Sequence, residues 1–152
     1  MGSWWLVKSE PAVYGIADLA RDGTTGWEGV RNFQARNALR AMTVGDPVLF
    51  YHSNADPPGV VGLARVLRAA FPDPTQFDPA SPTFDPTAKL ADPRWSSVEL
   101  AFEARFARPV SLEQLKSDPE LLGLEVARKG TRLSVHAVAA AHYDRIVALS
   151  SR

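Results

Sequence analysis

Short runs of apolar residues bounded by Gly, Pro, Asn and Asp recur along the chain and are typical of β-strands. The first run begins at Trp4 and stops at Pro11, because proline has no N–H to donate and disfavours helix in the residue before it. Trp4 and Trp5 would point to opposite faces of such a strand, so one is expected in the core and the other at a partly exposed or pocket-lining position. Further extended segments are predicted at residues 48–51, 59–70, 95–108 and 132–135.

Apolar residues three or four positions apart predict helices between these strands. Ile16 and Leu19 favour a short helix over residues 14–21, and Asn32 is placed to cap a second helix that runs to about Met42. Later helical segments are predicted to begin at the Ser111-Leu112-Glu113-Gln114 capping pattern, at Asp118-Pro119, and after Ser134, which would cap a last helix to about Leu149.

Residues 72–94 differ in character from the rest of the chain. Six prolines, four aspartates and few aliphatic residues predict a loop that is ordered by packing. No internal repeat or second linker is visible. The pattern therefore predicts one α+β domain over residues 1–152, with a strongly bent sheet or small barrel and helices packed around it.

Composition narrows the class of protein. The 152 residues are 45% apolar and 22% charged, as in a globular domain, and no apolar run approaches the ~20 residues that cross a membrane. The absence of cysteine excludes disulfides and thiolate chemistry, and a cytoplasmic location is expected. Seventeen basic and seventeen acidic residues cancel, which excludes a bulk polyanion binder. The abundance of Ala, Arg and Pro points to a bacterial gene of high GC content.

Several blocks, in one order along nearly the whole chain, resemble the EVE domain family: residues 4–11, 27–37, 48–54, 58–62, 73–78, 94–95 and 132–135. The resemblance implies a PUA-like fold, a strongly bent and mostly antiparallel β-barrel with flanking helices, related to the YTH domains that read methylated adenine in RNA. It further implies a non-enzymatic module that holds an extruded, modified nucleobase of DNA or RNA. No cofactor, metal or membrane is expected.

An extruded base needs aromatic or apolar walls, and stacking contributes about 1–3 kcal/mol per base. Trp27 and Trp95 are the candidate walls because each lies beside a loop, although either residue could instead pack in the core. Trp5 is the candidate from the first strand. In the central apolar strand, Phe50 is expected in the core, and Tyr51 is expected either there or in the pocket.

Uncharged Ser and Asn side chains suit the edge of a base because they carry donors and acceptors. Asn32 and Asn54 have alternative roles, as a helix cap and a turn former, and His52 suits either a phosphate contact or the turn itself. The resemblance places the pocket at the end of the first strand, the turn from Gly29 to Asn32 and the loop at 53–54. The predicted base pocket comprises Trp5, Lys8, Ser9, Trp27, Val30, Asn32, Tyr51, Ser53, Asn54 and Trp95.

Basic residues are predicted to contact phosphates in two small clusters, although such residues are also common on solvated faces. Asn32, Arg36 and Arg40 are four apart and share a helix face, with Arg31 at the start of that helix. The predicted set is Arg31, Arg36, Arg40, Arg128, Lys129 and Arg132. If three or four of them neutralise phosphates, the salt dependence of binding should have a slope of about −2 to −4.

Two other functions remain open at this point. Lys8, Ser9, Glu10 and Glu28 could form the site of a hydrolase acting on modified nucleosides, with Lys8 and Glu10 as its central pair. No spacing joins the three histidines, His52, His136 and His142, to a carboxylate site. Alternatively, the loop at residues 72–94 could serve a protein-interaction domain.

Overall fold

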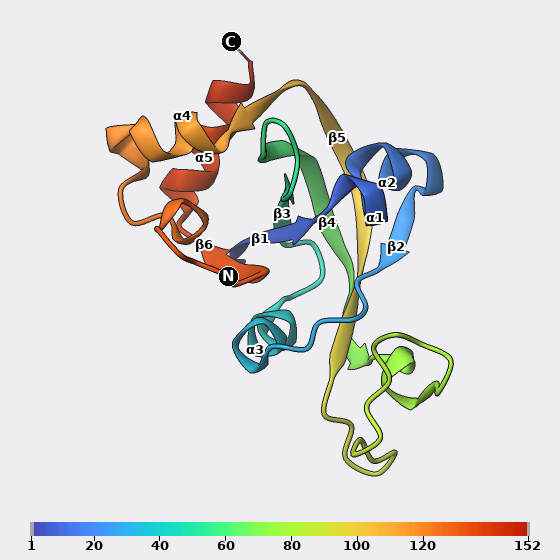
Figure 1. Cartoon of the computed structure of the whole chain (residues 1–152). Helices are drawn as coiled ribbons and strands as arrows, with labels where there is room; N and C mark the ends of the chain where they lie inside the picture. The colour runs from blue at the N-terminus through green and yellow to red at the C-terminus, as the bar shows by residue number, and fades with distance from the viewer. Residues whose placement is uncertain (1, 152) are drawn as a thin grey trace.

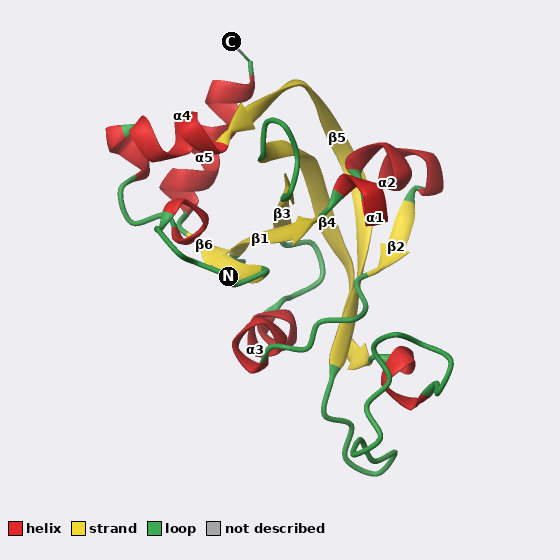
Figure 2. Cartoon of the chain, in the orientation of Figure 1, coloured by secondary structure: helices red, strands yellow, loops and turns green. Residues whose placement is uncertain are grey.

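The computed structural model describes residues 2–151, and its strands form one six-stranded mixed sheet (Figure 1, Figure 2). The order across the sheet is β2-β5-β4-β3-β1-β6, with β1 parallel to β3 and the other pairings antiparallel. The predicted bent, mostly antiparallel sheet is confirmed, although it is not closed into a barrel. Its strands are β1 (Trp4–Ser9), β2 (Thr24–Gly26), β3 (Pro47–His52), β4 (Gly59–Pro72), β5 (Ser96–Ser111) and β6 (Val135–Val138).

The bend arises in the two long strands, β4 and β5. Their register shifts at four places along the pairing, and each shift increases the local twist. Gly59 and Gly62 allow the two backbones to approach closely, since a Cβ at either position would collide with backbone atoms of β5. The sheet can therefore curl around a core on each face.

Each face of the sheet buries its own apolar cluster, because successive side chains of a strand point to opposite sides. Trp5, Val7 and Phe50 belong to the first cluster, and Leu6 and Tyr51 to the second. Residues of α2 and α3 contribute to the first cluster, and residues of α4 and α5 to the second. The helices are α1 (Pro11–Tyr14), α2 (Ile16–Asp22), α3 (Phe33–Ala41), α4 (Leu112–Ser117) and α5 (Ala140–Ser150).

The predicted caps are largely confirmed. Asn32 Oδ1 accepts a hydrogen bond from Ala35 N at 2.9 Å and caps α3. Ser111 and Gln114 form the capping box of α4, and Asp118 caps a short 3-10 turn, η2 (Pro119–Leu121). Two further 3-10 turns are η1 (Pro74–Phe77) and η3 (Glu125–Ala127).

One helix prediction is off by two residues at its start, and one is wrong. The helix predicted over residues 14–21 is α2 (Ile16–Asp22), while Tyr14 is the last residue of α1, because Gly15 between them is extended and its N–H donates to Asp18 Oδ2 at 2.7 Å. Ser134 caps no helix, since its carbonyl accepts from Lys8 N at 2.9 Å and the chain continues into β6. Ala139 precedes α5 instead and makes no side-chain cap.

The pair of tryptophans behaves as predicted. Trp5 is 5% exposed, in the first cluster, and Trp4 is half-buried against the second. Phe50 is fully buried as expected, and Tyr51 is also buried, on the opposite face. Residues 72–94 form the predicted loop ordered by packing, with η1 as their single helical turn among the described residues.

Candidate functional site

The carboxyl ends of β1 and β3 lie side by side and bring several predicted site residues together. In this parallel pair, Lys8 is opposite Tyr51 and Ser9 is opposite His52. The pairing continues beyond the strands, where Ser53 N donates to Ser9 O at 3.0 Å. Ends of parallel strands meet at one edge of a sheet, so this edge presents side chains from segments more than 40 positions apart.

A recess of about 300 Å³ opens at this edge, on the face of Tyr51. Lys8 is half-buried there, with Nζ 5.9 Å from the centre of the Tyr51 ring. Burial lowers the pKa of Lys8, and the charge of Glu125 opposes that effect. The recess is lined by five predicted site residues, Lys8, Tyr51, Ser53, Asn54 and Arg128, and by Pro58, Leu112, Lys116, Val126, Gly130 and Thr131.

Trp27 lies on the opposite face of β3. Its ring meets Phe50 edge-on, with centroids 5.5 Å apart, and its backbone is held by Val98 O and by the Ser97 hydroxyl. The side chain is largely buried, but the indole N–H has no hydrogen-bond partner among residues 2–151. The corresponding N–H of Trp5 donates to Asp46. Trp27 therefore retains a free donor at the rim of the first cluster.

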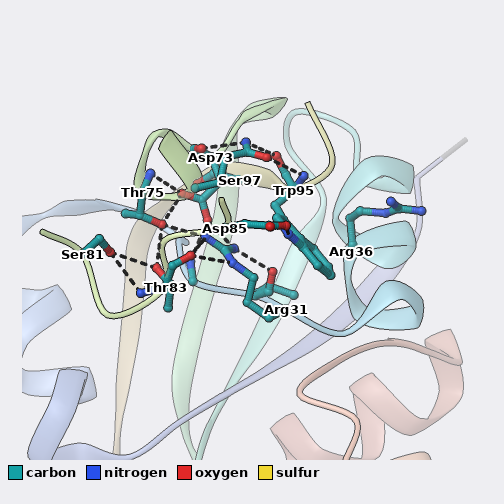
Figure 3. A network of polar contacts seen from close by, with 12 residues as sticks. Arg31, Arg36, Asp73, Thr75, Ser81, Thr83, Asp85, Trp95 and Ser97 are labelled. Atoms are coloured by element: carbon teal, nitrogen blue, oxygen red, sulfur yellow. Dashed lines mark hydrogen bonds and ion pairs between the residues drawn. The ribbon is translucent and has the colours of Figure 1, made fainter. Parts of the chain in front are cut away.

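The turn after Trp27 is held by the loop of residues 72–95 (Figure 3). Asp73 Oδ2 accepts from Gly29 N at 2.8 Å and from Arg31 Nη1 at 2.9 Å. Gly29 has φ of +81°, a left-handed conformation that glycine adopts readily. Burial of Asp73 opposes ionisation, but hydrogen bonds from Thr75, Gly29 and Arg31 outweigh it and lower the pKa of Asp73. We call this group of contacts the Asp73 clamp.

Glu28 sits beside Trp27 on this turn and was not among the predicted pocket residues. Its side chain is exposed and forms no ion pair within the described part of the chain. Burial of part of the carboxylate, followed by the charge of Asp73, raises the pKa of Glu28. An acidic residue directly after a tryptophan in a polar turn is the signal by which sequence reasoning could have included it.

Trp95, Trp5 and Asn32 lie neither in the recess nor beside the Trp27 side chain. Trp95 is buried under the 72–95 loop, where its indole N–H donates to Asp85 Oδ2 at 2.8 Å. Trp5 is held in the core by Asp46, and Asn32 is exposed, at the start of α3. Val30 is buried in the first cluster. Of the ten residues predicted for one pocket, four therefore line the recess, and Ser9 lies next to them at the end of β1. The other five are divided among the Trp27 turn, the core, the start of α3 and the 72–95 loop.

The predicted phosphate contacts also occupy different environments. Arg31 is committed to the Asp73 clamp, since each of its five N–H bonds points to an acceptor within the protein. Arg36 and Arg40 lie on α3 and face a second recess, described below. Arg128, Lys129 and Arg132 are exposed in the segment that leads to β6.

In the described part of the chain, no side-chain hydrogen bond or ion pair joins the residues considered for catalysis, Lys8, Ser9, Glu10 and Glu28. Glu10 is exposed and precedes α1, and no ion pair within 4 Å joins it to Lys8. His52 Nε2 accepts from Ile16 N at 3.0 Å and so fixes the start of α2. His136 is buried in β6, with Nδ1 bonded to Ala137 O, and His142 lies in α5.

Comparison with known proteins shows the family to which the chain belongs. The sequence model that describes the EVE domain family matches residues 3–149. The chain belongs to the EVE domain family. Thymocyte nuclear protein 1 of Mus musculus is 43% identical over 128 residues, which are 77% of this chain and 57% of that protein. This EVE domain therefore spans little more than half the length of such relatives.

Solved structures of similar chains share the fold throughout. A hypothetical protein from Leishmania major has a TM-score of 0.95 and 45% identity, covering 99% of this chain and 96% of the other. Human THYN1 protein, solved in complex with 5-methylcytosine containing DNA, has a TM-score of 0.93 and 36% identity, with 99% of each chain covered.

The likeness extends to YTH domains at the level of fold. The YTH domain of Zygosaccharomyces rouxii MRB1, solved in complex with N6-methyladenosine RNA, has a TM-score of 0.57 over 98% of this chain and 86% of the other. At 14% identity this likeness concerns the PUA-like fold alone. Within residues 2–151, no helix is long and apolar enough to cross a membrane, and no cluster of acidic residues and histidines could hold a metal ion.

Proposed function

We propose that this EVE domain binds nucleic acid and holds one extruded, modified nucleobase, without catalysing a reaction. The observation that carries the proposal is the human THYN1 structure with 5-methylcytosine containing DNA, whose fold matches this chain over 99% of its length. An extruded base requires a stacking surface, hydrogen-bonding groups for its edge, and cations for the adjoining phosphates. We assign these to the Trp27 turn and to the recess on the opposite face of the sheet.

We place the base against the Trp27 turn. Trp27 is 8% exposed, and the exposed part of its ring would meet the base. Its indole N–H has no partner in the described chain and would donate to a ring nitrogen or carbonyl oxygen. Glu28 provides an unpaired carboxylate, the acceptor that suits the exocyclic amino group of cytosine. The Asp73 clamp fixes the backbone between these side chains and α3, so the donor and acceptor are held before the ligand arrives.

The recess on the opposite face is better suited to phosphates than to a base. Three cations, Lys8, Lys116 and Arg128, line it, and among the described residues only Arg128 has a carboxylate partner, Glu125 at 3.3 Å. Ser53 and Asn54 add neutral donors. A strand whose base enters beside Trp27 would pass its backbone over the end of β1, where these groups lie.

The test is a titration of fluorescent oligonucleotides with one 5-methylcytosine, one N6-methyladenine, or neither, in single- and double-stranded form at low salt. Trp27→Ala should weaken binding by about 1–3 kcal/mol, the range for losing one stacked base. Trp27→Phe keeps a ring but removes the donor, so it should weaken binding less. Trp4→Phe, at a half-buried tryptophan on the other face, is the matched control.

A pocket that recognises a methyl group by apolar contact should prefer its mark by about 1–3 kcal/mol. Glu28→Gln, which removes the charge but keeps the shape, should lower the preference for bases with an exocyclic amino group. Equal affinity of the wild-type protein for all oligonucleotides would contradict the proposal. So would unchanged modified-base affinity in a folded Trp27→Ala variant.

The alternatives have less structural support. A hydrolase centred on Lys8 and Glu10 requires the two side chains to meet, and turnover of acylated or alkylated nucleosides that Lys8→Ala abolishes would establish it. A protein-interaction role for residues 72–94 cannot be tested by deletion, because that loop contains the Asp73 clamp. The bacterial origin and cytoplasmic location expected from composition stay predictions.

A further inference from the structure

A second recess lies between α3 and the end of the 72–95 loop, and none of residues 27–32 lines it. Its volume is about 240 Å³. Four of its eight lining residues are cationic, against one carboxylate. The lining consists of Phe33, Arg36 and Arg40 from α3, and of Thr87, Lys89, Asp92, Pro93 and Arg94 from the loop.

The guanidinium groups in this recess are held in place by neutral acceptors. Arg36 Nη1 donates to Arg94 O at 3.0 Å, and its other bonded nitrogens contact Asn37 Oδ1. Arg40 Nε donates to Ser96 Oγ at 2.8 Å, and Nη2 donates to the carbonyl oxygens of residues 93 and 94. Among the described residues, neither arginine has a carboxylate within 4 Å. Their positions are therefore fixed while their charges are not neutralised.

Stacking against aromatic rings also holds the Arg36 guanidinium in position. The Arg36 guanidinium lies 4.7 Å from the centre of the Phe33 ring, and Phe33 stacks on Trp95 with centroids 4.9 Å apart and planes at 24°. Phe33 is nevertheless 54% exposed, so the stack borders solvent. In Figure 3, Arg36 lies beyond Trp95 from the Arg31 network and points away from it.

The like charges of this recess are only partly compensated, because Arg94 pairs with Asp85 whereas Arg36 and Arg40 pair with no carboxylate among the described residues. Burial, and then the charges of Arg40 and Arg94, lower the pKa of Arg36. Arg94 Nη1 donates to Thr87 Oγ1 at 2.7 Å and approaches Asp85 no closer than 3.6 Å. Arg40 Nη1 and Arg94 Nη2 have no hydrogen-bond partner in the described chain. Pre-positioned N–H groups with uncompensated charge are the arrangement that an oxyanion satisfies.

We infer that the recess between α3 and residues 87–94 is a phosphate-binding site formed by Arg36, Arg40, Lys89 and Arg94. Guanidinium forks match the oxygens of a phosphate in pairs, which a lysine alone does not. The assignment of a nucleic-acid phosphodiester to the site rests on the proposed function. A terminal or free phosphate has the same chemistry. Arg31 has no place in this site, because its five N–H bonds are already used.

The experiment compares Arg36→Gln and Lys89→Gln with the control Arg21→Gln, which removes the same charge from an exposed position on α2. Lys89 is exposed, so this variant should fold even if Arg36→Gln does not. The affinity for an unmodified single-stranded oligonucleotide is measured from about 50 to 200 mM salt. Each site variant should bind about three- to tenfold more weakly at the low end, with a slope shallower by about 0.7, whereas the control should match wild type.

Two further measurements identify the source of the phosphate. Inorganic phosphate is titrated into the isotope-labelled protein, and its amide shifts at residues 36–40 and 89–94 should disappear in Arg36→Gln. If the oligonucleotide displaces inorganic phosphate, the occupant is a phosphodiester; if it does not, the site takes a terminal or free phosphate. Equal slopes in all three variants, with no phosphate-induced shifts at these residues, would overturn the inference.

The test of this phosphate site gives a result that can be distinguished from the test of the proposed base site. Loss of a phosphate contact should weaken binding to modified and unmodified oligonucleotides equally, so the ratio of the two affinities stays unchanged. Trp27→Phe should change that ratio and leave the salt slope intact. If the protein shows no preference for any modified base, the proposed function fails, while the slope and the phosphate shifts still decide the fate of this site.

Discussion

Replacing Asp73 by Asn tests whether the Asp73 clamp is a major source of stability for the Trp27 turn. Asp73 is fully buried and accepts four hydrogen bonds: from Gly29 N, Arg31 Nη1, Thr75 N and Thr75 Oγ1. Asparagine preserves the shape but converts one oxygen into an NH₂ group. If that group takes the place of Oδ2, it faces the Gly29 and Arg31 donors, and both lose their acceptor.

The expected cost follows from these contacts. Hydrogen bonds to a charged group contribute about 1.5–3 kcal/mol each, and two are lost. Removing one partner of a buried ion pair costs about 3–5 kcal/mol, because the other charge is left uncompensated. Arg31 keeps three of its acceptors, two of them backbone carbonyls, and its side chain is 23% exposed, so water relieves part of that penalty. We therefore expect Asp73→Asn to lower the free energy of unfolding by about 3 kcal/mol.

The assay is urea unfolding followed by tryptophan fluorescence. Asp78→Asn is the control, since Asp78 is another aspartate of the same loop whose Oδ1 accepts from Ala80 N, a bond that asparagine retains. The control should stay within about 0.5 kcal/mol of wild type. The pairing would be shown to matter little if Asp73→Asn unfolded at the same urea concentration as Asp78→Asn.

The same variant has a pH dependence of known sign. The folded-state pKa of Asp73 is lower than its ordinary value of 3.8, so its contribution is complete above that value and is lost as pH falls through the folded pKa. The difference in unfolding free energy between wild type and Asp73→Asn should therefore be constant near neutral pH and shrink below about pH 4. A difference that grows on acidification would refute the argument.

Two other changes have equally definite outcomes. Gly29→Ala should destabilise the protein by about 1–2 kcal/mol in urea unfolding, because φ is +81° and the new Cβ would lie 3.3 Å from Thr83 Cγ2. Gly130→Ala is the control, since its φ is +77° but open space surrounds it, so it measures the backbone strain without the contact. His136 is buried, with no partner for Nε2 among the described residues, and burial lowers its pKa. The free energy of unfolding should therefore fall as pH drops below about 6.5 towards the folded pKa, and in His136→Leu it should change less between pH 7.5 and 5.5. An equal pH dependence of the unfolding free energy in the two proteins would refute this.

Local signals in the sequence predicted local structure well. The cap at Asn32 and the capping box at Ser111 were predictable because their hydrogen bonds close within three residues. The prediction that Ser134 caps a helix was wrong because this residue lies instead at the start of a strand, where pairing with β1 satisfies its carbonyl. Such pairing joins positions more than 120 residues apart, and no local pattern indicates it.

The site was predictable in part for the same reason. Lys8 and Ser53 each follow a run of apolar residues, and the parallel pairing of β1 with β3 brings them to the same edge. The roles of Trp95 and Arg31 depended on carboxylates elsewhere, Asp85 and Asp73. An aspartate in a proline-rich loop gives no sign of which tryptophan or arginine it will hold, so both residues looked available to a ligand.

The 72–95 loop links the two proposed contacts with nucleic acid. Its first residue in contact with the turn, Asp73, holds the backbone beside Trp27, and its last segment presents Arg94 to Arg36 and Arg40. Trp95 connects the two ends, since it stacks on Phe33 of α3 and lies under Arg31. A change that loosens this loop should therefore weaken base preference and phosphate contact together, whereas Arg36→Gln and Trp27→Phe should each affect only one. Measuring both quantities in Asp73→Asn decides whether the loop acts as one structural unit.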